Sequence, residues 1–390
     1  QRLRLMSEWR EYQLRDLGKI VTGKTPPTKH RQNYDGDIPF ICIPDLGKSR
    51  YIFNTSKTIS NVGLETVKNC RLPKGSVVVS CIATIGQVGI TTEEISITNQ
   101  QINSVIPDKY QITSDFCYYY FKNMGEDLAQ FGGGGSIFEI ISKEKFSNIV
   151  LTIPPLPEQQ SIASILSSLD DKIDLLHRQN ITLEKMAETL FRQWFVEDVK
   201  EEWESKSLSS IAVFLNGLAC QKFPPKNDFE KLPVLKIKEL SSGITENSDW
   251  ATTDVRSEYI VKNGDVIFAW SASLMVKIWD GQECVLNQHL FKVSSEYYPK
   301  WFYYSWCKYH LDEFIAKAAS HATTMGHIKR GDLDAALVIV PPEDELKEMT
   351  LTFQPILDKF ILNNNQINTL TALRDTLLPK LMSGEVTVET

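Results

Sequence analysis

The chain of 390 residues lacks an excess of positive charge. It carries 42 Lys and Arg against 49 Asp and Glu, a formal net charge of −7. Phosphate neutralisation supplies most non-specific DNA affinity, so this balance taken alone argues against nucleic acid. The acidity is local, because residues 151–202 carry 5 basic and 10 acidic side chains and residues 343–390 carry 4 and 8. The remaining segments are close to neutral, so a DNA-binding role would need basic surface from a partner.

Long apolar runs and paired cysteines are also missing. No apolar stretch approaches the roughly 18 residues that a membrane span requires. The first residues, Gln1–Met6, show no apolar core of a secretory signal. The seven cysteines are scattered and form no Cys-x-x-Cys pair. We therefore expect reduced, mostly buried thiols in a cytoplasmic protein.

Catalytic and metal-binding patterns are scarce. The six histidines show no i, i+4 pair and no cysteine at ligand spacing, so no metal site is expected. The Asn-Pro-Pro-aromatic signature of amino-methyltransferases is absent. Asp170-Asp171-Lys172 resembles a fragment of a nuclease site, but it lies in an acidic helical segment, where a solvated face is the favoured interpretation. These gaps predict a protein without an active site of its own.

Gly18–Thr25 has the letters of a Walker A motif, G-x-x-x-x-G-K-[ST]. That mechanism needs a preceding strand and a following helix whose amides hold phosphate. Pro26 and Pro27 come directly after, and each disfavours helical angles in the residue before it. A nucleotide site is therefore disfavoured. A loop that presents Lys24 and Thr25 to a DNA phosphate is the functional alternative, and a plain surface turn is the other.

The most informative feature is an internal repeat. Ile153–Leu156 and Val340–Glu343 each lead into a long apolar-periodic stretch, and the two stretches align without a gap at an offset of 187 residues. Weaker echoes link earlier segments, including Asn99-Gln100 with Asn287-Gln288. The repeat predicts two units of globular domain plus long helix. We place a first globular domain at 1–152, a central helix at 153–200, a second globular domain at 201–340 and a C-terminal helix at 341–390.

The two helical stretches carry apolar residues at heptad spacing, which predicts a coiled-coil seam. The predicted seam consists of Ile162, Leu166, Leu169, Ile173, Leu176, Asn180, Leu183, Leu190, Phe353, Ile356, Phe360, Ile367, Leu370 and Leu377. The polar residues Asn180, Asn363 and Arg374 occupy seam positions. They either fix the register and pairing of the helices or are merely tolerated near solvent. The simplest architecture is an intramolecular antiparallel coiled coil that relates the two repeats by a pseudo-twofold axis, and homodimerisation through the same seams is the alternative. A helix of about 38 residues is ~57 Å long, more than the ~34–36 Å of one DNA turn, so the pair could act as a ruler.

The globular halves read as a mixed α/β fold of the α+β class. Predicted strands are 38–43, 76–83, 87–90, 102–106 and 149–153 in the first half, and 232–237, 265–269, 274–278, 290–293 and 337–340 in the second. Aromatic-rich helices are expected at 116–121 and 301–306. Their aromatic residues could stack on bases, but a buried helical face is favoured. The copies diverge at Gly132–Ser136 and Ala319–Thr323, which indicates either two different half-sites or drift in a loop.

The chain resembles the specificity subunit (HsdS) of type I restriction–modification systems. The resemblance rests on Leu17-Gly18 with Gly23-Lys24-Thr25-Pro26, on Ile153-Pro154-Pro155-Leu156-Pro157-Glu158-Gln159-Gln160, on Gln193-Trp194-Phe195, and on the closing Leu377–Val386. It spans nearly the whole chain. The second half departs from the pattern, because Pro341-Pro342 is followed by Glu343-Asp344-Glu345 rather than the Glu-Gln pair.

The resemblance implies two target-recognition domains, each reading half of a bipartite, asymmetric site in double-stranded DNA. It implies two antiparallel helices that set the gap and dock two methyltransferase (modification) subunits, which restriction/translocase subunits can join. S-adenosylmethionine and ATP would belong to those partners, and this chain would bind no cofactor, no metal and no membrane. The rival interpretations are a coiled-coil interaction scaffold without DNA specificity and a P-loop NTPase.

Base and phosphate contacts should come from polar side chains. The candidates in the first half are Lys24, Thr25, Lys29, Arg31, Ser80, Thr84, Gln87, Asn99 and Gln100, and those in the second are Gln221, Lys222, Lys226, Ser271, Ser273, Asn287, Gln288, His321, Thr323 and Thr324. Asn99-Gln100 and Asn287-Gln288 hold matching positions, so they can equally be hydrogen-bonding residues at strand ends.

Overall fold

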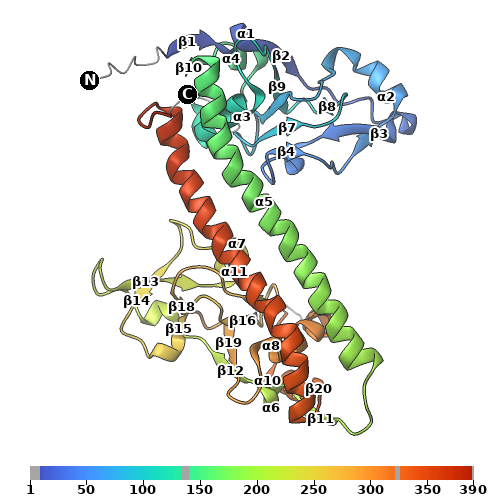
Figure 1. Cartoon of the computed structure of the whole chain (residues 1–390), viewed down its shortest axis with the longest axis vertical. Helices are drawn as coiled ribbons and strands as arrows, with labels where there is room; N and C mark the ends of the chain where they lie inside the picture. The colour runs from blue at the N-terminus through green and yellow to red at the C-terminus, as the bar shows by residue number, and fades with distance from the viewer. Residues whose placement is uncertain (1–8, 133–139, 321–325, 389–390) are drawn as a thin grey trace. The chain divides into compact units, whose positions relative to one another are not determined.

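A computed structural model describes residues 9–132, 140–320 and 326–388. The chain divides into two compact units (Figure 1). Unit 1 contains Gln1–Asp174 and Thr369–Thr390, and unit 2 contains Leu175–Asn368. Each unit therefore combines one globular domain with part of both long helices, α5 (Leu156–Arg192) and α11 (Glu343–Met382).

The domain of unit 1 is built on a five-stranded sheet of order β2-β9-β6-β7-β4. Its strands are β2 (Gly18–Thr22), β4 (Tyr51–Ile52), β6 (Val77–Ser80), β7 (Val88–Thr91) and β9 (Ile102–Pro107). A three-stranded sheet of order β5-β3-β8 adjoins it, formed by β3 (Tyr34–Ile41), β5 (Thr58–Ile59) and β8 (Ile97–Thr98). β1 (Arg10–Gln13) pairs antiparallel with β10 (Val150–Ile153) at the domain's junction with α5.

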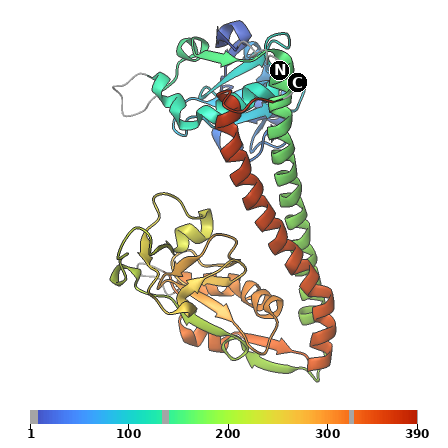
Figure 2. The ribbon, with the colours of Figure 1, turned by 60° about the vertical axis from the view of Figure 1, so that its left-hand side comes forward.

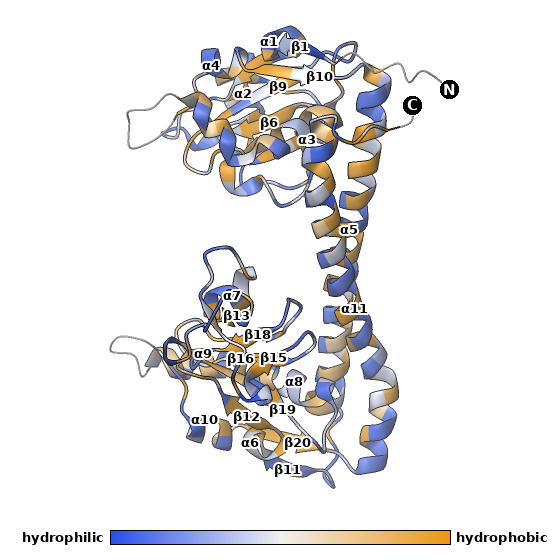
Figure 3. Ribbon diagram, turned by 90° about the vertical axis from the view of Figure 1, so that its left-hand side faces the viewer, coloured by the Kyte–Doolittle hydropathy of each residue, from blue (hydrophilic) through white to orange (hydrophobic). Residues whose placement is uncertain are grey.

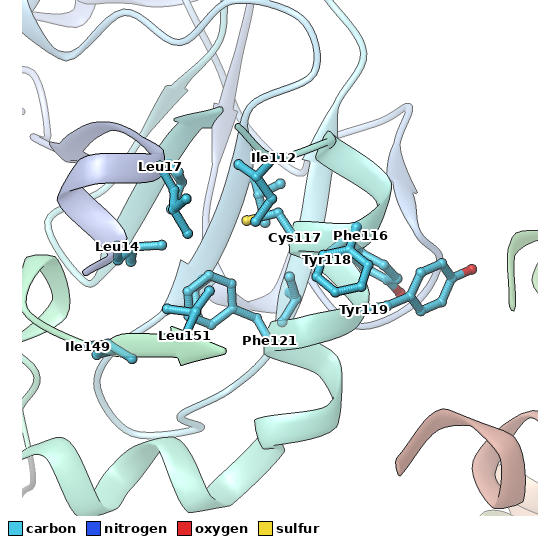
Figure 4. Close-up of a cluster of buried hydrophobic side chains, with 14 of the residues drawn as sticks. Leu14, Leu17, Ile112, Phe116, Cys117, Tyr118, Tyr119, Phe121, Ile149 and Leu151 are labelled. Carbon is cyan, nitrogen blue, oxygen red and sulfur yellow. The ribbon is translucent and has the colours of Figure 1, made fainter. Parts of the chain in front are cut away.

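The core of unit 1 packs helices against the larger sheet. The helices are α1 (Leu14–Leu17), α2 (Asn61–Thr66), α3 (Ser114–Met124) and α4 (Lys143–Ser147), with short 3₁₀ turns at Arg31–Asn33, Ile43–Asp45, Lys68–Cys70 and Gly125–Gly132. Figure 4 shows Leu14, Phe116 and Phe121 among the buried side chains of this core. The aromatic residues of α3 are therefore core residues, as favoured from sequence, because the helix lays them on β6 and β7.

Unit 2 repeats this plan with its strands divided into two four-stranded sheets. A four-stranded sheet has the order β12-β19-β16-β17, and a second has the order β14-β13-β18-β15. The strands are β12 (Val213–Asn216), β13 (Lys231–Leu235), β14 (Trp250–Thr252), β15 (Ile260–Val261), β16 (Val266–Ala269), β17 (Met275–Ile278), β18 (Cys284–Leu286) and β19 (Leu290–Ser294). β11 (Glu204–Ser207) pairs with β20 (Leu337–Val340), as β1 does with β10.

The helices of unit 2 are α6 (Leu208–Ile211), α7 (Ile237–Ser242), α8 (Lys300–Tyr309), α9 (Leu311–Ser320) and α10 (Arg330–Ala335), with 3₁₀ turns at Cys220–Lys222 and Ser257–Tyr259. Three of these helices, α6, α8 and α10, correspond in place to α1, α3 and α4 of unit 1, whereas α7 lies between β13 and β14 and α2 follows β5. α8 buries Trp301, Phe302 and Trp306. The strands around β6 and β16 carry mostly hydrophobic residues in Figure 3, which is the pattern of strands buried on both faces.

The two long helices pair within the chain and antiparallel, side by side in Figure 2. In unit 2 the rings of Trp194 and Phe353 lie 6.3 Å apart, while Asn180 bonds Asn363 further along. In unit 1, Asp170 forms an ion pair with Arg374, and Leu166 and Leu378 belong to the same hydrophobic core. Residue numbers fall from Trp194 to Asp170 while those of their partners rise along α11 from Phe353 to Arg374, so the two helices are antiparallel. A π-helical turn, Gln193–Glu197, ends α5 and buries Phe195.

Each of the predicted seam residues is buried or half-buried. Ile162, Leu166, Ile173, Leu176, Asn180, Phe353 and Ile367 are buried, and Leu169, Leu183, Leu190, Ile356, Phe360, Leu370 and Leu377 are half-buried. Gly384, with a φ of +74°, follows the end of α11 as expected of a helix stop. All ten predicted strands overlap strands of the structure, but several were predicted too long: β3 ends at Ile41, β6 ends at Ser80 rather than residue 83, and β13 ends at Leu235.

Candidate nucleic-acid interface

Three loops of unit 1 meet at one end of its larger sheet. They are the segment that follows β2 from Gly23, the β6–β7 connection and the turn between β8 and β9. We call this set edge 1. The Gly23 amide donates to Ile102 O at 3.1 Å, and the Lys24 amide donates to Thr98 O at 2.9 Å. The Asn99 amide donates to Ile41 O at 3.2 Å, so backbone groups alone join both sheets here.

Unit 2 forms the same junction from different side chains. Edge 2 consists of the segment after β12 from Gly217, the β16–β17 connection and the turn between β18 and β19. Gly217 donates to Leu290 O at 3.1 Å, Leu218 to Leu286 O at 2.9 Å and Asn287 to Leu235 O at 3.1 Å. These three bonds match those of edge 1, so the repeat preserves a backbone frame.

Two glycines permit this close approach. A Cβ atom on Gly23 would stand 2.1 Å from Asn99 O, and one on Gly217 would stand 2.2 Å from Asn287 O. Any side chain would therefore push the strand end away from the turn. Gly23 of the Walker-like sequence therefore allows the strand end to pass close to the turn at Asn99. Its preceding residues form β2 and no helix follows Thr25 directly, so the phosphate-loop geometry is not formed.

The matching asparagines hold the turns. Asn99 Oδ1 accepts from the Gln101 amide at 3.0 Å, and Asn287 Oδ1 accepts from the His289 amide at 3.2 Å. Asn287 is buried and Asn99 is half-buried. Of the two interpretations from sequence, the structure supports residues that hydrogen-bond at strand ends.

Other candidates of edge 1 divide into exposed and internal groups. Lys24, Lys29, Arg31, Thr84 and Gln100 are exposed, while Thr25 and Gln87 are half-buried. The Thr25 hydroxyl donates to Gln100 Oε1 at 2.6 Å, which ties the first loop to the turn. Ser80 is fully buried, and its hydroxyl donates to Thr84 O and accepts from the Gln87 amide. Ser80 therefore shapes the loop and offers nothing to a base.

The candidates of the second half are more dispersed. Gln221, Lys222, Lys226 and Ser273 are exposed, and Gln288 is half-buried. Lys226 is paired with Asp254 at 2.6 Å. Ser271 is buried, and its hydroxyl lies 3.2 Å from His289 Nδ1, so it also has an internal role. His321, Thr323 and Thr324 lie outside the described residues, as do Gly133–Ser136 of the divergent loop.

Trp270 and His289 of edge 2, and His327 beside it, escaped the sequence analysis. The Trp270 ring lies 5.9 Å from that of His289 and 6.3 Å from that of His327, and both imidazoles are exposed. The Trp270 indole donates to Asn216 Oδ1 at 3.2 Å. Trp270 occupies the position of Cys81 at the same backbone junction, because both carbonyls accept from an isoleucine amide, Ile141 or Ile328. Edge 2 thus presents aromatic and imidazole groups that edge 1 lacks there.

Polar layers interrupt the seam of the helix pair. In unit 2, Asn363 Nδ2 donates to Asn180 Oδ1 at 2.9 Å, and Asn180 Nδ2 donates to Asn364 Oδ1 at 2.6 Å. Asn363 is fully buried and Asn180 is 7% exposed. Because both asparagines are buried, they are not merely tolerated near solvent. The alternative, a polar layer that fixes the pairing of the two helices, fits this arrangement.

A buried ionic cluster forms the layer in unit 1. Asp170 accepts from Arg374 Nη1 and from the Tyr119 hydroxyl, both at 2.8 Å, and lies 3.5 Å from Lys122. Burial alone would raise the Asp170 pKa, but Lys122, Arg374 and Tyr119 outweigh it and hold the pKa below its ordinary value. Burial lowers the pKa of Lys122. The sequence-based expectation of a solvated face was wrong for Asp170, because its partners come from α3 and α11, distant in sequence.

The described ranges contain neither a metal-binding cluster nor a helix that could cross a membrane. No group of three or more His, Cys, Asp or Glu side chains there could hold a metal ion. No helix in the same ranges has the length and apolarity to cross a membrane. All seven cysteines are free thiols, five of them buried, and burial raises the pKa of Cys81 to about 11.

Two edges with one backbone frame and different side chains, carried by paired helices, define a protein built from two recognition modules. The family model for the type I restriction modification DNA specificity domain matches residues 6–185 and 200–372. The MjaIX type I restriction enzyme specificity subunit of Methanocaldococcus jannaschii is 30% identical over 419 residues, which cover 99% of this chain and 95% of that protein. The chain belongs to the type I restriction–modification DNA specificity family.

Two further comparisons agree with this assignment. The HindI specificity subunit of Haemophilus influenzae is 38% identical over 148 residues, which cover 37% of this chain and 32% of that one. The crystal structure of a type I restriction–modification S subunit from M. genitalium has a TM-score of 0.63 at 14% identity, covering 100% of this chain and 99% of the other. The latter similarity shows the shared fold. Specificity subunits of this family are non-catalytic.

Proposed function

We propose that this chain is the DNA-recognition subunit of a type I restriction–modification complex and that edges 1 and 2 each read one half of a bipartite, asymmetric site. The observation that carries the proposal is the pairing of a repeated backbone frame at Gly23 and Gly217 with different exposed side chains around it. A conserved frame supports the same docking on two duplexes. Different side chains support two different half-site sequences.

The exposed groups of the edges suit contact with DNA. Lys24, Lys29 and Arg31 supply cations to phosphates in edge 1, where Gln100 and Thr84 can reach base edges. In edge 2, Gln288, His289 and Trp270 form the central group. Because phosphates are neutralised by few basic residues here, affinity should depend strongly on basic surface of the partners.

The helix pair would set the spacing of the half-sites and dock two methyltransferase subunits, with restriction/translocase subunits joining that assembly. S-adenosylmethionine and ATP would be bound by those partners. The helices α5 and α11 are long and continuous and carry net negative charge. These features support a role in setting the half-site spacing and in docking the methyltransferase subunits. A lone P-loop activity lacks structural support, since β2 occupies the phosphate-loop position.

Methylome sequencing of cells that express the chain with its cognate methyltransferase subunit tests this function. The expected result is one motif of two separated half-sites. Gln288→Ala with His289→Ala should relax only one half-site, by ~1–3 kcal/mol per lost base contact. Gln100→Ala should relax only the other half-site. If the assembled complex binds no DNA in mobility-shift assays, the chain is an interaction scaffold and the proposal fails.

A further inference from the structure

Unit 2 contains an apolar pocket of about 590 Å³ beside its helix pair. Its walls include Leu183, Ala187 and Phe191 of α5, Tyr304 of α8, and Phe353 and Ile356 of α11. Of the lining residues, Phe191 and Phe353 are buried, while Tyr309 is 50% exposed. The function proposed above gives this pocket no role of its own.

The internal repeat identifies the corresponding place in unit 1. The long helices align at an offset of 187 residues, so Ala187 corresponds to Arg374, and Leu357 of the pocket corresponds to Asp170. α3 and α8 align at an offset of 186, which pairs Tyr119 with Ser305. The pocket is therefore the counterpart of the Asp170 cluster.

Side chains explain why the two places differ. In unit 1, Arg374 and Tyr119 each reach Asp170 at 2.8 Å and occupy the space between α3 and the helix pair. In unit 2 the corresponding residues are Ala187 and Ser305, whose side chains are much smaller than those of Arg374 and Tyr119. The ionic cluster is thus replaced by an apolar hollow, at a place where a packed core would leave no such volume.

The rim of the pocket carries an excess of negative charge. Glu184 and Glu188 share the single cation Lys308, whose Nζ lies 3.6 Å from each carboxylate. Asp312 is exposed nearby, and Arg192 is paired with Glu197. Burial, together with Glu184 and Glu188, raises the pKa of Tyr304. The surface complements a segment that carries an apolar residue beside a basic one.

We infer that this pocket is an anchor site for one methyltransferase subunit, which inserts an apolar side chain flanked by a basic residue from a helix. The corresponding place in unit 1 is closed by Arg374, Asp170 and Tyr119, so two copies of that subunit dock with unequal affinity. This inference rests on the proposed function. It adds that the duplicated chain offers one strong docking site and one weak one.

Transplanting the unit 1 cluster tests the inference. The triple variant Ala187→Arg, Leu357→Asp and Ser305→Tyr should fill the pocket with the side chains that pack in unit 1. The full chain and its variants are titrated with the cognate methyltransferase subunit, and native mass spectrometry counts one-to-one and one-to-two complexes. In the wild type the second subunit should bind about 30-fold more weakly than the first, the effect of losing one buried anchor. In the triple variant the first affinity should fall to that of the second.

Matched variants separate the possible outcomes. Arg374→Ala with Asp170→Leu and Tyr119→Ser should open the unit 1 counterpart and strengthen the second binding event. If the transplanted triple variant does not fold by circular dichroism, Ala187→Leu fills the pocket with an apolar group and should weaken the first event. Equal wild-type sites, or unchanged binding by the filled variants, would overturn the inference alone. Self-association of the chain that the filled variants abolish would also overturn it, since a second copy would then be the occupant. A wild-type chain that binds no methyltransferase subunit would instead refute the proposed function.

Discussion

Ala83 and Ala272 adopt the same left-handed backbone conformation, with φ values of +61° and +56°, in the loops that follow β6 and β16. They lie 189 residues apart and hold the same position in the repeat, since Gly75 and Gly264, at +84° and +87°, have the same separation. Non-glycine residues rarely adopt this conformation, so its occurrence in both copies marks a fixed bend at each edge.

Replacing these alanines tests the bend. Ala83→Gly should leave the free energy of unfolding within about 1 kcal/mol of the wild type, because relief of strain offsets the greater entropy of the unfolded chain. Ala83→Val should destabilise by more than about 1 kcal/mol, since a β-branched residue fits positive φ poorly. Urea unfolding measures both. The same order should hold at Ala272, and a harmless valine at either position would contradict a shared bend.

Gly23 and Gly217 should resist substitution. Gly23→Ala forces a Cβ to 2.1 Å from Asn99 O, and Gly217→Ala meets Asn287 O at 2.2 Å. Each should cost more than about 2 kcal/mol, because backbone must move. Each variant should also disturb reading of one half-site only. Gly331→Ala is the matched control: its Cβ meets nothing within 4 Å in α10, and it should be neutral or slightly stabilising.

The Asp170 cluster should make unit 1 sensitive to acid. The Asp170 pKa is lower in the folded chain than in the unfolded chain, where it is about 3.9. Its contribution is therefore complete above that value and is lost as pH falls through the folded pKa. Asp170→Asn should destabilise by roughly 3 kcal/mol at pH 7, because it leaves Arg374 without its buried partner. Thermal unfolding between pH 2.5 and 7 measures the effect, which should shrink as pH falls.

Asp375→Asn provides the control for that experiment. Asp375 also pairs with Arg374, at 2.8 Å, but it is 57% exposed. Its loss should cost less than about 1 kcal/mol, as for exposed pairs generally. Equal effects of the two substitutions would mean that the cluster is solvated and contributes nothing special.

The helix pair offers a test of spacing. Inserting seven residues into α5 after Arg178 and seven into α11 after Asn365 keeps both heptad registers and adds ~10.5 Å of helix. At 3.4 Å per base pair, the gap between half-sites should lengthen by about 3 base pairs. Both half-site sequences should stay as they were. Methylome sequencing gives the motif, and an unchanged gap would refute the ruler.

An insertion in α5 alone is the matched control for this pair. It lengthens the α5 stretch between Asp170 and Asn180 but leaves the α11 stretch between Asn363 and Arg374 unchanged. The two polar layers then cannot both form, so the chain should lose stability rather than acquire a longer gap.

Sequence reasoning predicted the architecture well because its signals are local and repeated. The Val77–Ser80 strand, the buried face of Phe116 and Tyr119, and the seam from Ile162 to Leu190 follow from apolar periodicity. β2 was missed because Gly18 and Gly23 resemble a phosphate loop, and only pairing with β9 settles its conformation. The partners of Asp170 were missed for a related reason: Tyr119 and Arg374 are 51 and 204 residues away.

At the edges, chemical type was predictable but orientation was not. Ser80 and Gln100 look alike as candidates, yet one is fully buried and the other is exposed. That difference depends on which loop closes over which strand. Trp270 had no motif around it, and its importance is visible only beside His289 and His327.

The frame at Gly23 and Gly217 has a consequence for how this protein can change over generations. Its hydrogen bonds join main-chain atoms, so apart from the two glycines they place little demand on the identity of neighbouring residues. Mutations at exposed loop positions that neither hold a turn, as Asn99 and Asn287 do, nor adopt positive φ, as Ala83 and Ala272 do, can therefore accumulate without loss of folding. A lineage can acquire a new target sequence through such point changes. Selection would act on the loops while the scaffold beneath them stays fixed.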